Sequence, residues 1–171
     1  MRKSSAVLGS LVFFIAAPGT VAGLLPWWIS RWRLEEAPQW YVAVRILGGA
    51  MIAAGLYVLI DSFLQFALKG LGTPAPPAPP TRLVVSGYYR YVRNPMYVAV
   101  LCTVIGQALV FADVALAAYA AIVCAAFMAF VMGYEEPMLK RLFGEQYAIY
   151  RANVPPWIPR LRAWNAQDAP S

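Results

Sequence analysis

MYVAVLCTVIGQALVFADVALAAYAAIVCAAFMAFVMGY, residues 96–134, is the stretch that decides the fold, because Asp113 is the one charged residue in it. A membrane-spanning helix needs about 20 apolar residues, so this stretch can form two helices. The first arm, residues 96–111, is short for a hydrocarbon core of roughly 30 Å and is expected to dip in and return through a tight turn at residues 112–113. We therefore predict a shallow membrane hairpin whose two ends open at one face.

Composition places the whole chain in the membrane class. Apolar residues make up 61% of the sequence and charged residues 13%, whereas soluble globular domains have about 45–50% and about 25%. The length suits one domain without a separate soluble enzyme domain. The sequence contains no His, which excludes His-ligated metals and His-dependent nucleophile pairs, and we predict no metal site.

Two further apolar segments, residues 5–29 and 41–68, bring the expected number of transmembrane helices to about four. Arg2 and Lys3 ahead of the first segment also resemble a secretory signal, but the apolar run is too long for a signal core alone. We predict a single all-α integral membrane domain, residues 1–171. Its parts are two N-terminal spans (1–69), a Pro-rich cytoplasmic connector (70–95), the helical hairpin (96–134), and a cytoplasmic amphipathic helix with a tail (135–171).

The second span and the connector carry further signals. Gly48, Gly49 and Gly55 are expected to permit close helix packing. Asp61 lies at i, i+4, i+8 spacing with Gln65 and Lys69, so these side chains can satisfy one another, and Asp61 is a weaker site candidate. Residues 73–80, TPAPPAPP, predict an extended polyproline segment that is either a plain spacer or a strap over a site.

The distribution of Lys and Arg predicts the orientation. The outer loop would carry only Arg31 and Arg33, and Arg45 lies inside the second span. The positive-inside rule therefore places both termini in the cytoplasm, which we expect to be that of a prokaryote with the chain in its plasma (inner) membrane. Nucleic acid is a poor partner for this charge, since the charge follows topology. The inner side would hold Arg2, Lys3, Lys69, Arg82, Arg90, Arg93, Lys140, Arg141, Arg151, Arg160 and Arg162.

A polar, aromatic block, GYYRYVRNPMY, precedes the hairpin at residues 87–97. Asn94 and Pro95 predict a helix start, since Asn caps well and Pro is tolerated at the first helical position. The free N–H groups of that helix end would favour a carboxylate or phosphate. The alternative is an ordinary capped helix end with snorkelling Arg side chains.

A second polar block follows the hairpin. Glu135 and Glu136 are expected to end the fourth span, and an amphipathic helix is predicted from Pro137 onward. Glu136 and Lys140 are spaced for a surface ion pair. Glu135 could accept hydrogen bonds from a ribose, face a cationic ligand, or pair with Arg90 or Arg93. Beyond this helix, the Pro residues at 155–159 predict a tail folded back over the bilayer surface, with Trp157 as an interfacial anchor.

Together, the two blocks resemble the isoprenylcysteine carboxyl methyltransferase and phospholipid methyltransferase group of integral membrane enzymes, over about residues 70–160. The matching residues are Leu83, Val84, Gly87, Tyr89, Arg93, Asn94, Pro95, Met96, Tyr97, Glu135, Glu136, Leu139, Phe143, Gly144, Tyr147, Tyr150, Val154 and Pro155. The resemblance implies S-adenosylmethionine as the methyl donor, held without a Rossmann sheet, and a lipophilic or lipid acceptor that arrives from the bilayer.

From the chemistry of their side chains, we expect Arg93 and Glu135 to act in catalysis. Arg93 would hold the donor's carboxylate or an anionic acceptor, and Glu135 the donor's ribose or ammonium. By motif position, the cofactor-binding residues implied by the resemblance are Arg82, Leu83, Val84, Tyr89, Asn94, Pro95, Met96, Tyr97 and Glu135.

The chain departs from its relatives at two positions. Asn94 stands where many relatives have His, and Val131 stands where relatives that methylate a prenylated cysteine have a substrate-binding Arg. The acceptor therefore stays open among a lipid amine, a carboxylate or thiol on an apolar molecule, and a prenyl-cysteine-like compound. Two other classes remain as alternatives: an NADPH-dependent enzyme similar to sterol reductases, and a non-catalytic membrane scaffold or lipid-binding subunit.

Overall fold

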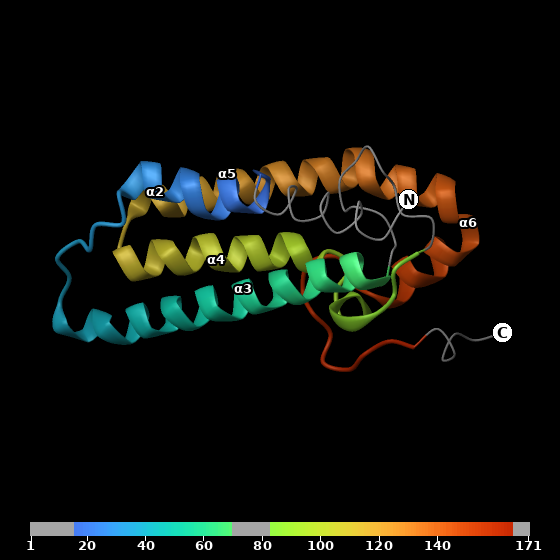
Figure 1. Cartoon of the computed structure of the whole chain (residues 1–171), viewed down its shortest axis with the longest axis horizontal. Coiled ribbons are helices and arrows are strands. Elements are labelled where there is room, and N and C mark those ends of the chain that lie inside the picture. Colours follow the sequence, from blue (N-terminus) through green and yellow to red (C-terminus); the bar gives the residue numbers. More distant parts are fainter. Residues whose placement is uncertain (1–15, 70–82, 166–171) are drawn as a thin grey trace.

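The computed structural model describes residues 16–69 and 83–165, with no side-chain detail for 65–69. Within these ranges every regular element is helical, as predicted. Figure 1 shows an elongated bundle in which helices α2, α3, α4 and α5 run along one axis. Residues 5–15 of the first expected span, the polyproline segment 73–80 and Arg82 lie outside the described residues.

The N-terminal part of the bundle consists of a π-helical turn, η1 (Thr20–Leu24), and a short helix, α2 (Leu25–Ser30). Partly buried hydrogen bonds tie this part to the hairpin. Gln107 donates to the Ala22 carbonyl at 2.7 Å, and the Tyr119 hydroxyl donates to the Val21 carbonyl at 2.9 Å. The chain then passes through a short 3₁₀ turn, η2 (Gln39–Tyr41), into α3 (Val42–Lys69).

Helix α3 packs closely against α4 (Pro95–Phe111), because glycines remove side chains at the crossing. A Cβ atom on Gly48 would lie 2.6 Å from the Gly106 carbonyl oxygen, and one on Gly55 would lie 2.5 Å from Thr103 Oγ1. Helix packing through Gly48 and Gly55 is thus confirmed. The same prediction for Gly49 is wrong, since nothing lies within 4 Å of a Cβ there and this residue is on an exposed face.

The hairpin turn lies where the sequence predicts it. Helix α4 ends at Phe111, and Ala112 takes a left-handed conformation with φ 56°. The Asp113 side chain then caps α5 (Val114–Phe130) by accepting from the Ala115 and Leu116 amides at 2.7 and 3.1 Å. The start of α4 and the end of α5 therefore lie at the same end of the bundle.

The helices suit a membrane to different degrees. Two helical stretches, Gln39–Leu64 and Val114–Asn153, are long and apolar enough to cross a bilayer, with mean hydropathies of 2.0 and 2.4. Only 17% and 22% of their apolar windows are buried inside the protein, as expected for helices that face lipid. Helix α4 is shorter, as predicted for the first arm of the hairpin.

The helix does not break at Glu135 and Glu136, where the fourth span is predicted to end. Helix α5 continues through a π-helical turn, η4 (Val131–Glu135), directly into α6 (Glu136–Asn153). The wide π turn tolerates the missing N–H of Pro137, which would break an ordinary helix interior. The chain bends instead at Gly144, whose φ of 51° and ψ of −121° are not helical. Glycine adopts this conformation without the steric cost that a side chain would add.

Candidate functional site

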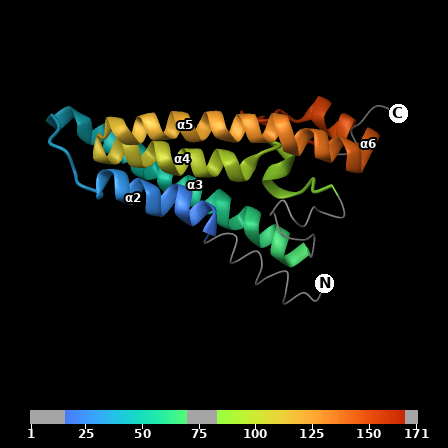
Figure 2. The ribbon, with the colours of Figure 1, turned by 90° about the horizontal axis from the view of Figure 1, so that it is seen from above.

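Both polar blocks lie at one end of the bundle. Figures 1 and 2 show this end at the right, where the segment around η3 (Gly87–Arg90), helix α6 and residues 154–165 come together. The loop of residues 31–38 and the α4–α5 turn lie at the opposite end. The hairpin therefore brings the two blocks to one face, as the sequence predicts.

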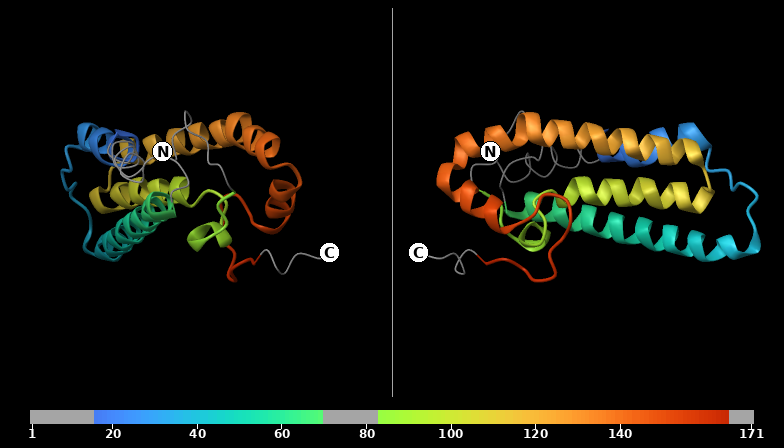
Figure 3. Two further views of the ribbon diagram at one scale, coloured as in Figure 1. Left: turned by 45° about the vertical axis from the view of Figure 1, so that its right-hand side comes forward. Right: turned by 180° about the vertical axis from the view of Figure 1, so that it is seen from behind.

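The tail, residues 154–165, crosses back over the first polar block, as Figure 3 shows from behind. Backbone hydrogen bonds attach it: the Arg93 amide donates to the Pro155 carbonyl at 2.9 Å, and the Trp164 amide donates to the Arg90 carbonyl at 2.9 Å. The Arg90 guanidinium returns a bond to the Trp164 carbonyl, also at 2.9 Å. The tail is thus held against this block by its backbone.

Asn94 has a different role from the one predicted. Helix α4 does begin at Pro95 with Asn94 at the preceding cap position, but the Asn94 side chain makes no capping hydrogen bond. Its Nδ2 donates to the Pro156 carbonyl at 3.1 Å instead, because the tail presents an acceptor beside it. The first turn of α4 is therefore left without a side-chain cap from Asn94.

The closest contact between the two blocks joins Tyr97 and Glu135. The Tyr97 hydroxyl donates to Glu135 Oε1 at 2.5 Å. Aromatic rings lie around this pair: the Tyr97 ring centroid is 4.7 Å from that of Phe127 and 6.5 Å from that of Trp157. Glu135 is the last residue of the π turn, a kind of irregularity frequent at functional sites.

Arg93 pairs with the second acid and not with the first. Its Nη2 lies 3.0 Å from a Glu136 oxygen, and the Arg151 Nη2 lies 3.4 Å from the other. The predicted Glu136–Lys140 surface pair does not appear among the ion pairs of the described residues, because Glu136 points inward with a 14% exposed side chain. Pairing of Glu135 with Arg90 or Arg93 is likewise replaced by the bond to Tyr97.

The Arg93 guanidinium is itself unusual. Its side chain is 8% exposed, and its Nε and Nη1 atoms are buried without a hydrogen-bond partner in the described part of the chain. Leaving a buried donor unsatisfied costs about 1–3 kcal/mol, and more for a charged group. An anionic group at this place could accept from Nε or from Nη1, which lie on different edges of the guanidinium.

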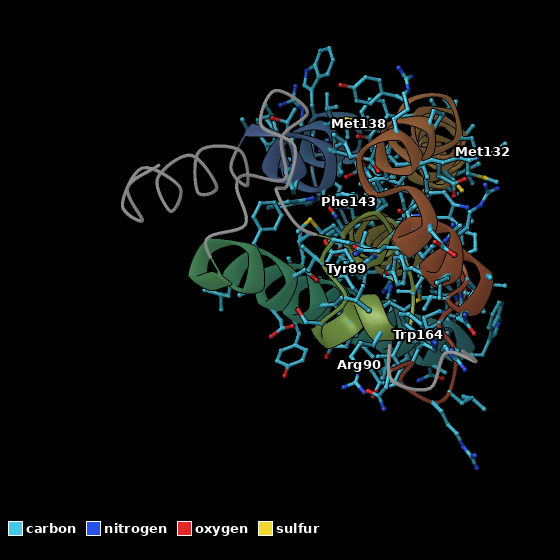
Figure 4. The ribbon with its side chains drawn as sticks, turned by 90° about the vertical axis from the view of Figure 1, so that its right-hand side faces the viewer. Tyr89, Arg90, Met132, Met138, Phe143 and Trp164 are labelled. Carbon is cyan, nitrogen blue, oxygen red and sulfur yellow. The ribbon has the colours of Figure 1, made fainter. Side chains whose placement is uncertain are left out.

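Tyr89 lies on the same side of η3 as these acids. Burial raises the pKa of the Tyr89 phenol well above its ordinary value, and Tyr150, Glu135 and Tyr97 add to this effect. The phenol is therefore neutral at physiological pH. The Tyr150 hydroxyl donates to the Tyr89 carbonyl at 2.7 Å and holds this segment against α6. Figure 4 shows Tyr89 near the middle of this end, with Arg90 and Trp164 next to each other at its edge.

The remaining predicted residues that the structure describes lie in apolar packing. Leu83 packs on a cluster of Tyr147, Tyr150, Val154 and Trp164, and Val84 is buried. Pro95 is buried at the start of α4, and Met96 packs against the main core.

The sequence analysis missed Phe127, and it took Trp157 for a membrane anchor. The spacing of Phe127, Val131 and Glu135 at i, i+4, i+8 was a usable signal, because such residues share one helix face.

Among residues 16–69 and 83–165, no group of three or more His, Cys, Asp or Glu side chains could hold a metal ion.

Comparison with known proteins assigns the chain to a family. Residues 43–146 match the sequence model of the phospholipid methyltransferase family, and this range covers more than half of the chain. The protein therefore belongs to that family, and the predicted resemblance is confirmed. The match begins inside α3, although the sequence motifs indicated a likeness only from about residue 70.

The chain is also similar to protein-S-isoprenylcysteine O-methyltransferase B of Arabidopsis thaliana. The two are 35% identical over 78 residues. This segment is 46% of the present chain and 40% of the relative, so the chain matches less than half of that relative's length.

Proposed function

We propose that the protein transfers a methyl group from S-adenosylmethionine to a lipophilic small molecule or lipid at the face where the two polar blocks meet. The observation that carries this proposal is the hydrogen-bonded pair of Tyr97 and Glu135, with the rings of Phe127 and Trp157 next to Tyr97. Arg93, with two buried nitrogens that lack a hydrogen-bond partner among the described residues, lies at the same end of the bundle. Membership of the phospholipid methyltransferase family supports it.

The chemistry of the side chains fits such a donor, which supplies an electrophilic methyl group on a sulfonium. Glu135 would accept hydrogen bonds from the donor's ribose or face its ammonium group. One of the two buried N–H groups of Arg93, at Nε or at Nη1, would donate to the donor's carboxylate. Tyr89 and Tyr97 would face the sulfonium through their rings, an attraction worth about 0.5–2 kcal/mol.

The other residues implied by the motifs would shape the donor site. Backbone and side-chain groups of the first block would line it, and the tail would keep that block in place through the bonds to Arg93 and Asn94. The proposed donor-binding set is Arg82, Leu83, Val84, Tyr89, Asn94, Pro95, Met96, Tyr97 and Glu135.

The protein's contribution to the transfer would be alignment and exclusion of water. Holding the acceptor about 3–3.5 Å from the methyl carbon can supply roughly 7–11 kcal/mol of the barrier without a general base. The aromatic rings around Tyr97 would keep the site dry, which would favour transfer to a carboxylate or thiolate, because its negative charge cancels the positive charge of the sulfonium as the bond forms.

The acceptor would reach the site from the bilayer, and the water-soluble donor from the cytoplasm. Two of the helices are long and apolar enough to span a membrane, and we propose about four spans in total. Both termini would then lie on the cytoplasmic side of a prokaryotic plasma membrane. Val131, 2% exposed, offers no charge where some relatives bind a carboxylate with Arg, so acceptor recognition must use other groups.

Stabilisation of the purified protein by ligands tests the proposal, because a ligand that binds only the folded state raises its stability. S-adenosylhomocysteine should raise the melting temperature, and NADPH should not. Glu135→Gln should weaken S-adenosylhomocysteine binding by about tenfold or more, which is 1.4 kcal/mol. No stabilisation by S-adenosylhomocysteine would contradict the proposal. Stabilisation by NADPH would favour the reductase class, and stabilisation by neither would favour a scaffold.

A further inference from the structure

A pocket lies on the other side of η3 from the proposed methyl-transfer site. It has a volume of about 380 Å³ and is lined by Tyr57 and Asp61 of α3 and by Gly87, Tyr88, Arg90 and Tyr91 of the first polar block. Ligand sites commonly have volumes of about 300–1,000 Å³. We call it the α3–η3 pocket.

Consecutive residues of η3 separate the two sites. Tyr89 interacts with Tyr150, Glu135 and Tyr97. Tyr88 instead has its ring centroid 6.4 Å from that of Tyr57, edge to face, and lies within electrostatic reach of Asp61. The α3–η3 pocket therefore does not share its lining with the Tyr97–Glu135 pair.

The pocket combines a negative group with aromatic rings. Tyr57 and Asp61 are one helical turn apart and share a face of α3. Tyr88 and Tyr91 bring two further phenol rings to the same space. Rings around a carboxylate attract an ammonium group, since the faces of the rings are negative and recognition of alkylated ammonium ligands uses such cages.

Arg90 adds a positive group at the other side of the pocket. Among the described residues its hydrogen bonds go to the tail, from Nε to the Trp164 carbonyl and from Nη2 to the Asn165 side chain. These bonds fix the guanidinium at the pocket while Nη1 is not among the bonded atoms. An arginine held in this way is suited to a phosphate group.

The depth of the pocket agrees with a lipid ligand. Tyr57 and Asp61 belong to the stretch of α3 that is apolar enough to cross a membrane, and the other lining residues belong to the first polar block, so the pocket lies where this helix meets that block. This is where hydrocarbon gives way to headgroups. Arg45, the other charged residue of that stretch, donates to the Glu35 carbonyl at 2.5 Å and stacks over Tyr41. An ionisable side chain at membrane depth generally marks a functional site.

We propose that the α3–η3 pocket binds a zwitterionic headgroup, with an ammonium group between Asp61 and the tyrosine rings and a phosphate at Arg90. A phospholipid in the surrounding leaflet is the source that the depth of the pocket favours. The bound lipid would sit outside the methyl-transfer site and hold η3 against α3. This inference is independent of the proposed methyl transfer, because it rests on other residues.

Native mass spectrometry of the purified full-length protein tests the pocket. The protein is mixed in an uncharged detergent with equal amounts of phosphatidylcholine and phosphatidylglycerol that carry the same acyl chains. The wild type should retain the zwitterionic lipid about fivefold more than the anionic one, and Asp61→Asn should remove this preference. Equal retention by the wild type, or an unchanged preference in Asp61→Asn, would overturn the proposal.

A matched pair at Tyr57 keeps the test independent of the fate of Asp61→Asn. This side chain is 66% exposed, so its replacement leaves the core intact. Tyr57→Phe keeps the ring and should keep the preference, whereas Tyr57→Leu should lose it. The same lipid preference in both variants would overturn the ammonium cage.

Soluble probes distinguish the source of the headgroup. Glycerophosphocholine should compete with the retained lipid, and glycerol 3-phosphate should compete at least about fivefold less well. Equal competition by the two would overturn recognition of the ammonium group. S-adenosylhomocysteine affinity should be the same in Asp61→Asn and wild type, and a parallel loss of both would overturn the separation of the two sites.

Discussion

Tyr97 and Glu135 are 38 positions apart in the chain, and the hydroxyl of the first donates to the carboxylate of the second at 2.5 Å. One residue lies in the first turn of α4 and the other at the end of the π turn that follows α5. Their bond joins the two ends of the hairpin. It places a polar contact between the start of α4 and the end of the π turn.

Removal of the Tyr97 hydroxyl should affect both stability and ligand binding. Tyr97→Phe keeps the ring between Phe127 and Trp157 but leaves the Glu135 carboxylate without its donor. We expect a loss of about 1–3 kcal/mol in the free energy of unfolding and weaker S-adenosylhomocysteine binding by about fivefold or more. Thermal unfolding with and without S-adenosylhomocysteine measures both effects.

Tyr134→Phe is the matched control for this change, since Tyr134 is 43% exposed and its ring stacks on Phe130. It should change neither quantity. Equal effects of the two substitutions would show that the Tyr97 hydroxyl has no special role.

The Arg93–Glu136 ion pair allows a structural role to be separated from a binding role. Arg93→Met alone leaves a buried carboxylate without its main partner and should cost about 3–5 kcal/mol. In the double variant Arg93→Met, Glu136→Leu, neither charge of the pair is left buried without its partner, so most of the stability should return. Arg151 loses a partner there, but its side chain is 54% exposed and this loss should be small.

Ligand binding should not return with stability in this double variant. If Arg93 receives the donor's carboxylate, S-adenosylhomocysteine affinity stays at least about tenfold below wild type. Isothermal titration measures it under conditions where both proteins are folded. Wild-type affinity in the double variant would assign Arg93 to the support of α6 alone.

The sequence predicts those parts of the molecule that depend on local chemistry. The turn of the hairpin follows from Asp113, whose charge interrupts the apolar stretch and whose side chain caps α5. The convergence of the two blocks follows from that turn, because the free ends of a hairpin meet.

Pairings inside the site depend on structure that spacing does not show. The π turn before Glu136 shifts the helical register, so it turns Glu135 toward Tyr97 and Glu136 toward Arg93. Its presence has no sequence signature here. The attachment of the tail uses backbone groups, such as the Pro155 carbonyl and the Arg93 amide, which every sequence contains.

Close approach of α3 and α4 should make Gly55 intolerant of substitution. A methyl group there would lie 2.5 Å from Thr103 Oγ1 and 2.7 Å from the Ala99 carbonyl oxygen, so Gly55→Ala must push the helices apart. Overpacking of this kind costs about 1–3 kcal/mol. Gly49→Ala, where a Cβ meets nothing within 4 Å, should be neutral or stabilising by up to about 1 kcal/mol. Melting temperatures in one detergent compare the two, and equal effects would contradict the close packing at Gly55.

The docking of the tail should control the mobility of the first polar block. Trp164 is 6% exposed and packs with its ring centroid 5.8 Å from that of Tyr150, while its amide donates to the Arg90 carbonyl. Trp164→Ala removes that packing, at a typical cost of about 3–5 kcal/mol, and should release the tail from residues 90–94.

Hydrogen–deuterium exchange measures this release directly, because the Arg93 amide is protected by the Pro155 carbonyl. Exchange in peptides that cover residues 88–94 should rise in Trp164→Ala, and exchange in α4 and α5 should stay as in wild type. Leu161→Ala is the control, since Leu161 is 100% exposed and its loss removes no packing. Unchanged exchange at residues 88–94 in Trp164→Ala would mean that the backbone bonds alone hold the tail in place.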